Sequence, residues 1–217
     1  MRAQPWVRRR RLASAHPAPA RLAAAIHQSR DVEVFQQALT PAEVKALYRP
    51  YHRLVILRCT KKLLDVIKPA VLAGNAPRPD DWYANLLWLE SRKCLLLTQA
   101  ATLFTIFEPG IRVAALRDIT TTVTSLIARE LAREGLPAGT FGELETTTVA
   151  LAKTADRSIL GCMNDMAHYG EAVIYQSGGL AAADLADINQ ALRRNIQSAR
   201  DYRQPIDLVT ESLNHRS

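Results

Sequence analysis

The stretch "WYANLLWLESRKCLLLTQAATLFTIFEPG", residues 82–110, decides the fold. Two apolar runs flank the polar "ESRK" of residues 90–93, and this pattern predicts a β-hairpin. The next segment, "TLFTIFEP", predicts a third strand that stops before the Pro109-Gly110 turn. The centre of the chain is therefore expected to form a β-sheet.

The segments on either side of this block add strands and helices. Strands are predicted for residues 53–59 and 144–153, and helices for 61–72, 113–136, 156 to about 174 and about 182–201. The expected N-caps are Thr60 for the first of these helices and either Asp156 or Ser158 for the third. The segment that follows, "DYRQPIDLVTESL", closes the chain with no assigned element. This order indicates an α+β fold, a mainly antiparallel sheet of about five strands packed against several helices.

The chain divides by composition into a leader and one domain. Residues 1–40 are rich in Arg, Ala and Pro, which predicts a disordered basic N-terminal leader, and residues 41–53 form a short helix and linker. Residues 54–209 then form a single α+β domain, and 210–217 a tail. Two alternatives for the leader are an upstream mis-assigned start, with a product beginning near Val55, and a transit peptide.

The net charge of +7 belongs to the N-terminal segment. Residues 1–53 hold ten Lys/Arg against three Asp/Glu, whereas the remaining residues hold 18 of each and are neutral. A neutral domain lacks the clustered cations that give most nucleic-acid affinity, so nucleic acid is expected as a partner only through the basic leader. No run reaches the ~18 apolar residues of a membrane span, so we expect no membrane association and a cytoplasmic protein.

The three cysteines show no metal or disulfide spacing. Cys59, Cys94 and Cys162 lie far apart in the sequence, with no CxxC pair and no nearby histidine at zinc spacing. We expect buried free thiols in a reducing compartment, with no metal site and no cofactor.

The segment "KTADRSILGCMND", residues 153–165, is the first candidate site. Its helix start could bind an anion or a partner through Lys153, Thr154, Asp156, Arg157, Ser158, Asn164 and Asp165. The structural alternative is that Asp156 only caps the helix, Arg157 pairs with a carboxylate, and Gly161 is small because a strand passes close by. A catalytic thiol is disfavoured because Cys162 and Asn164 point to different sides of a helix and His168 lies six residues from the thiol.

The segment "DWYANLLWLESRKC", residues 81–94, is the second candidate surface. It gathers Asp81, Trp82, Asn85, Glu90 and Arg92 around the predicted hairpin. Aromatic side chains on a sheet can stack on bases, but the neutral charge favours core and interface packing. The turn "RCTKKLL" lacks the glycines of a phosphate-binding loop, so its lysines are expected to be solvated.

Four blocks, "RCTKKLL", "DWYANLLWLESRKCLLLT", "KTADRSILGCMND" and "DYRQPI", resemble a family of small bacterial proteins classed as a domain of unknown function. Some members are carried on mobile elements and integron cassettes. The resemblance runs from about residue 54 to 209 and implies a domain that begins near Leu54. Ser91 stands where many relatives have arginine, and Cys162 where many have serine or threonine. The resemblance implies no reaction, cofactor or partner.

Three hypotheses for function follow from these observations. The first is a non-catalytic regulatory, defence or stress-related protein that binds a protein partner through the two candidate surfaces. The second is an enzyme or toxin acting on a phosphate-bearing substrate, with Lys153 and Arg157 binding the anion and Asp165 or His168 as the base. The third is nucleic-acid binding through the leader. The second hypothesis would be favoured if one open pocket brought together Arg157, Asn164, Asp81 and Arg92.

Overall fold

The sheet has five strands in the spatial order β4-β3-β2-β1-β5. The computed structural model describes residues 54–144 and 147–215, so the predicted disordered leader, the helix near residues 41–48 and the linker lie outside the described residues. The strands are β1 (Leu54–Cys59), β2 (Trp82–Leu89), β3 (Arg92–Gln99), β4 (Thr105–Glu108) and β5 (Thr148–Lys153).

The predicted hairpin is confirmed. Strands β2 and β3 are antiparallel from the pair Trp82 and Gln99 to the pair Leu89 and Arg92. Glu90 and Ser91 form the two-residue connection, with φ of 47° and 62°. Positive φ at both central residues matches the right-handed twist of paired strands, and this keeps the hairpin tight.

The sheet is mixed, whereas the sequence predicted a mainly antiparallel one. Strand β1 runs parallel to both of its neighbours, with Leu57 beside Trp82 of β2 and Leu151 of β5. Helices or long connections separate these strands in the sequence, as parallel neighbours require. The hydrophobic pattern of a sequence indicates which strands are buried but not whether neighbouring strands run parallel. The parallel pairing of β1 with β2 and β5 could therefore not be predicted.

Helices pack on both faces of the sheet. They are α4 (Lys61–Ile67), α5 (Val113–Arg117), α6 (Ile119–Arg133), α7 (Arg157–Gln176), α8 (Leu185–Arg194) and α9 (Pro205–Asn214). The helix predicted over 113–136 is two helices, because Asp118 ends α5 and its carboxylate accepts from the Thr121 N–H at 3.4 Å. Helix α9 was not predicted, and it continues past the domain boundary placed at residue 209.

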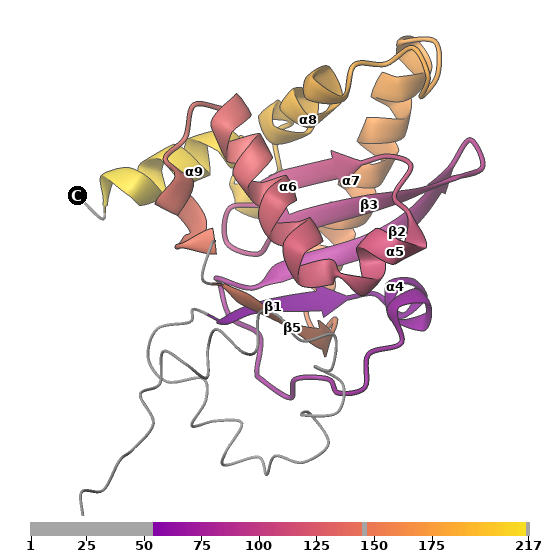
Figure 1. Cartoon of the computed structure of the whole chain (residues 1–217). Helices are drawn as coiled ribbons and strands as arrows, with labels where there is room; N and C mark the ends of the chain where they lie inside the picture. The colour runs from indigo at the N-terminus through magenta and orange to yellow at the C-terminus, as the bar shows by residue number, and fades with distance from the viewer. Residues whose placement is uncertain (1–53, 145–146, 216–217) are drawn as a thin grey trace, which may run out of the picture. The chain divides into compact units, whose positions relative to one another are not determined.

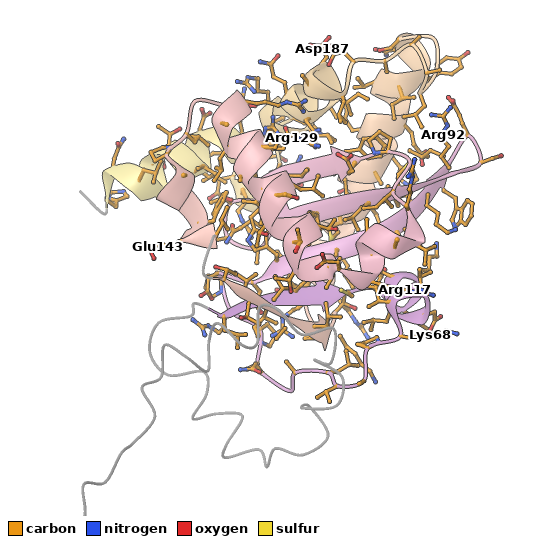
Figure 2. The ribbon with its side chains drawn as sticks, viewed as in Figure 1. Lys68, Arg92, Arg117, Arg129, Glu143 and Asp187 are labelled. Carbon is orange, nitrogen blue, oxygen red and sulfur yellow. The ribbon has the colours of Figure 1, made fainter. Side chains whose placement is uncertain are left out.

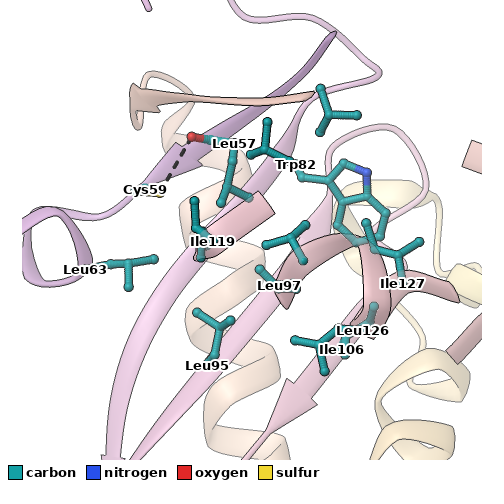
Figure 3. Packing of buried hydrophobic residues seen from close by; sticks show 14 of the residues in the cluster. Leu57, Cys59, Leu63, Trp82, Leu95, Leu97, Ile106, Ile119, Leu126 and Ile127 are labelled. Atoms are coloured by element: carbon teal, nitrogen blue, oxygen red, sulfur yellow. Dashed lines mark hydrogen bonds between the residues drawn. The ribbon is translucent and has the colours of Figure 1, made fainter. Parts of the chain in front are cut away.

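The alternation of side chains along the strands divides the core in two. One cluster contains Leu57, Trp82 and Leu97 and packs against α4, α5, α6 and α9; Figure 3 shows it from close by. The other contains Tyr83 and Leu96 and packs against α7 and α8. In Figure 1, α6 lies in front of the sheet and α7 behind it. Because helices cover both faces of the sheet, the loops between strands and helices lie at the two ends of the strands.

Candidate functional site

Asp156 caps α7, as predicted. One carboxylate oxygen accepts from the backbone N–H of Ser158 at 2.8 Å and of Ile159 at 3.3 Å. These amides are among those that a bound anion would use at a helix start. The chain's own carboxylate therefore occupies the position proposed for an anion.

The other members of the first candidate site are mostly exposed. Lys153, Arg157 and Ser158 are exposed, and among the described residues neither Lys153 nor Arg157 has a side-chain hydrogen bond or ion pair. The Thr154 N–H donates to the Cys59 carbonyl at 3.3 Å. The expected pairing of Arg157 with a carboxylate was wrong. The space around Gly161 is also open, because a Cβ built there would meet nothing within 4 Å, so no strand passes close by.

Asn164 and Asp165 lie on the exposed face of α7 with His168. His168 Nδ1 is 3.8 Å from a carboxylate oxygen of Glu171, and both side chains are largely exposed. Cys162 faces the core instead, and burial raises the pKa of its thiol. The thiol and the imidazole thus lie on different sides of one helix, and no nucleophile–base pair forms there.

Asp81, expected on the second surface, is buried. The Arg58 Nε lies 2.5 Å from its carboxylate oxygen, and both side chains are 2% exposed. Arg58 also donates to the Asn75 carbonyl at 2.8 Å, while the Arg78 N–H donates to Asp81 at 3.0 Å. This buried ion pair joins the end of β1 to the start of β2.

Tyr83 lies beside this pair. It is opposite Arg58 in the sheet register. Burial raises the pKa of Tyr83, and the charges of Asp156 and Asp81 act in the same direction, against the opposing effect of Arg58. A buried polar cluster therefore lies near the start of α7. No local pattern indicates this role of Arg58, because its partner Asp81 is 23 residues away in the chain.

Trp82 and Asn85 also serve the interior. Trp82 is 1% exposed, and its ring centroid lies 5.1 Å from that of Phe141 in an edge-on contact. It is therefore not part of the second candidate surface, and the core packing favoured for the aromatic side chains is confirmed at this residue. Thr60 stands at the N-cap of α4, but its hydroxyl donates to the Asn85 side chain at 2.9 Å and makes no cap bond. Asn85 is thus already paired within the sheet.

Glu90 and Arg92 remain at the surface, at the free end of the hairpin. A carboxylate oxygen of Glu90 accepts from the Leu180 N–H at 2.9 Å, which fixes the hairpin tip to the loop after α7. An open groove of about 610 Å³ lies beside the tip, lined by residues that include Trp88, Arg92, Lys93, Gly110, Ile111 and Arg112. Figure 2 shows Arg92 near this end of the hairpin.

The two candidate surfaces do not converge. Helix α7 has 20 residues and is about 30 Å long. Its first turn lies near the Arg58–Asp81 pair, and the loop that follows it meets Glu90. Arg157 and Arg92 therefore lie near opposite ends of this helix, and no shared pocket joins them with Asp81 and Asn164 among the described residues.

Metal-binding clusters and membrane-spanning helices are both absent from the described residues. No group of three or more His, Cys, Asp or Glu side chains there could hold a metal ion. Over the same residues, no helix combines the length and apolar character needed to cross a membrane.

Comparison with protein families gives a match over most of the chain. Residues 56–208 match a family described as Domain of unknown function (DUF6933). The chain belongs to this family. The DUF6933 match begins in β1 and ends in α9, so it includes both candidate surfaces. The expected membership of a family of unknown function is confirmed. A search of curated proteins found no match.

Proposed function

We propose that this DUF6933 protein is a non-catalytic interaction protein that binds a protein partner. The observation that supports this proposal is that the polar side chains of the two candidate surfaces lie apart from one another in the fold. Asp81, Asn85, Glu90 and Asp156 all accept or pair within the fold. Among the described residues, no buried side-chain nitrogen or oxygen is left without a hydrogen-bond partner.

An enzyme needs reacting groups held within hydrogen-bond reach of one another around a substrate. In this chain the inward polar groups stabilise the fold, and the outward ones, such as Arg157 and Asp165, face solvent along one helix. Surfaces of this kind suit contact with another macromolecule. The resemblance to small proteins of mobile elements favours a regulatory, defence or stress-related role for this binding.

The proposal is tested by site-specific photo-crosslinking in cells that express the full chain. A photoreactive residue replaces Trp88 or Asn164 in turn, and Ser125, exposed on α6 and outside both surfaces, is the control position. We expect a discrete protein adduct from position 88 or 164 and none from position 125.

A parallel assay tests the enzyme alternative. The purified chain is incubated with nucleotides, RNA and DNA, and phosphate release and strand cleavage are measured. We expect no turnover. Turnover that disappears in Arg157→Ala, with the thermal midpoint unchanged, would show that the protein is an enzyme and would overturn the proposal, as would the absence of adducts from both surface positions.

A further inference from the structure

The groove beside the hairpin tip combines an exposed aromatic ring with unpaired cations. Trp88 is 60% exposed although it shares a strand face with the buried Trp82 and Leu86. Lys93 is its cross-strand partner, and the ammonium nitrogen lies 4.9 Å from the ring centroid. A cation–π contact of this kind holds both side chains in place at the surface.

The groove has a one-sided charge. Arg92, Lys93 and Arg112 line it, and no Asp or Glu does. Among the described residues no carboxylate pairs with Arg92 or Arg112. Other arginines of the domain do have such partners: Arg129 pairs with Glu108 at 2.6 Å, and Arg193 pairs with Glu134 at 2.7 Å.

The walls of the groove are fixed by the fold. The Ile111 N–H donates to the Lys93 carbonyl at 2.9 Å, which ties the turn after β4 to β3. Glu90, the nearest acid in the sequence, accepts from the Leu180 N–H through its carboxylate and does not line the groove. The backbone that carries the three cations is therefore held in place before any ligand binds, which lowers the backbone entropy cost of binding.

We infer that this groove binds an acidic peptide segment of a partner protein, with an apolar side chain of that segment against Trp88. The inference rests on the proposed function and names the surface and the chemistry of the partner. Carboxylates complement the three cations, and arginine and tryptophan are the side chains that contribute most at protein interfaces.

Two other occupants fit the groove less well. The chain's own residues 1–53, with ten Lys/Arg against three Asp/Glu, carry charge of the same sign. Single-stranded nucleic acid stacks successive bases on several aromatic rings along a basic track. This groove offers a single aromatic ring, Trp88, and belongs to a domain that is neutral overall.

The test measures binding of labelled peptides to the full chain by fluorescence anisotropy. The probe is a heptapeptide of Asp and Glu with one central Phe, compared with the same peptide carrying Asn and Gln and with an oligothymidylate. Variants Arg112→Glu and Trp88→Ala alter the groove, and Lys62→Glu, at an exposed position of α4 outside both candidate surfaces, is the matched control. Thermal midpoints establish that each variant is folded.

We expect the acidic peptide to bind at low salt and to lose about tenfold or more in affinity in Arg112→Glu, with no loss in Lys62→Glu. The neutral peptide should bind at least about tenfold more weakly. Equal losses in Arg112→Glu and Lys62→Glu, no binding of the acidic peptide, or tighter binding of the oligothymidylate through the same groove would each overturn the inference.

These outcomes are separable from those of the crosslinking experiment. If a partner crosslinks through position 164 and its binding is unaffected by Arg112→Glu, the interaction function stands and the groove assignment fails. If the crosslinking gives no partner and Arg157-dependent turnover appears, the interaction function itself fails.

Discussion

At the scale of single residues, two glycines with opposite surroundings show which positions the backbone constrains. Gly179 has a φ of +99°, and a Cβ there would lie 3.0 Å from a carboxylate oxygen of Glu90. Gly161 lies inside α7, where a Cβ would meet nothing within 4 Å. The first glycine permits the close approach of the hairpin tip, and the second has no such role.

We therefore predict opposite effects of the same substitution at these glycines. Gly179→Ala should lower the free energy of unfolding by about 1–2 kcal/mol, because alanine is strained at positive φ and crowds Glu90. Gly161→Ala should raise it by about 0.5–1 kcal/mol, because alanine is the better helix former. Urea denaturation of both variants provides the measurement. A loss of stability at residue 161 would mean that its surroundings are not open.

At the scale of elements, α8 protects the exposed edge of the sheet. Strand β4 is an edge strand, and its Phe107 N–H donates to the Asn189 side-chain oxygen at 2.6 Å. The Asn189 side-chain NH₂ donates in return to the Phe107 carbonyl at 3.0 Å. The buried amide thus occupies the place of a neighbouring strand and prevents edge-to-edge pairing between molecules.

Asn189→Ala should therefore cost about 2–3 kcal/mol in the free energy of unfolding, because it leaves two buried backbone groups of Phe107 unpaired. The variant should also aggregate more readily. Gln190→Ala, at an exposed position of the same helix, is the matched control and should change little. Chemical denaturation together with light scattering measures both effects; equal behaviour of the two variants would contradict this role of Asn189.

The elements that were predicted correctly are those with a local signal. The cap at Asp156 and the hairpin at residues 90–91 depend on neighbours within a few positions. Asp81 and Trp82 were assigned to the second candidate surface although both are buried, because alternation shows which face a side chain takes but not which distant helix or strand covers it. The partner of Asp81 is Arg58, and the ring of Trp82 packs against Phe141.

The same limit of local patterns explains why the geometry of the candidate site was not predicted. The cluster around Arg58 and the groove beside Trp88 both join segments that are distant in the sequence, and pairing across the sheet brings them together. In the alternation along β2, Trp88 occupies a position where a buried residue is expected. It lies beyond the ends of both flanking strands, because β1 ends at Cys59, opposite Ala84, and β4 ends at Glu108, opposite Leu95.

At the scale of the whole molecule, a network of charges joins the two helical layers around the edge strand β4. Helix α6 belongs to one face of the sheet and α8 to the other. A carboxylate oxygen of Glu130 in α6 lies 3.1 Å from a guanidinium nitrogen of Arg193 in α8. The Glu134 carboxylate lies 2.7 Å from a guanidinium nitrogen of Arg193 and 2.8 Å from one of Arg194. The Arg193 and Glu134 side chains are 1% and 6% exposed, so solvent screens this pair only weakly, whereas Arg194 is 40% exposed.

This network predicts a loss of stability in acid. Burial alone raises the pKa of Glu134, but hydrogen bonds and charges from Arg194 and Arg193 outweigh it and hold this pKa below its ordinary value of 4.5. The unfolded chain then binds the proton more readily than the folded one. The stabilisation from Glu134 is full above its ordinary pKa and is lost as the pH falls through its pKa in the folded state.

The measurement is the free energy of unfolding of wild type and Glu134→Gln between about pH 6 and pH 3. At the upper end the variant should be the less stable, because Arg193 is left buried with one carboxylate partner, Glu130. The difference should shrink on acidification, because the wild-type carboxylate also becomes neutral. Glu143→Gln, at an exposed position labelled in Figure 2, is the matched control for the removal of a surface carboxylate. Parallel curves for wild type and Glu134→Gln would show that the charge of Glu134 does not stabilise the contact between the layers.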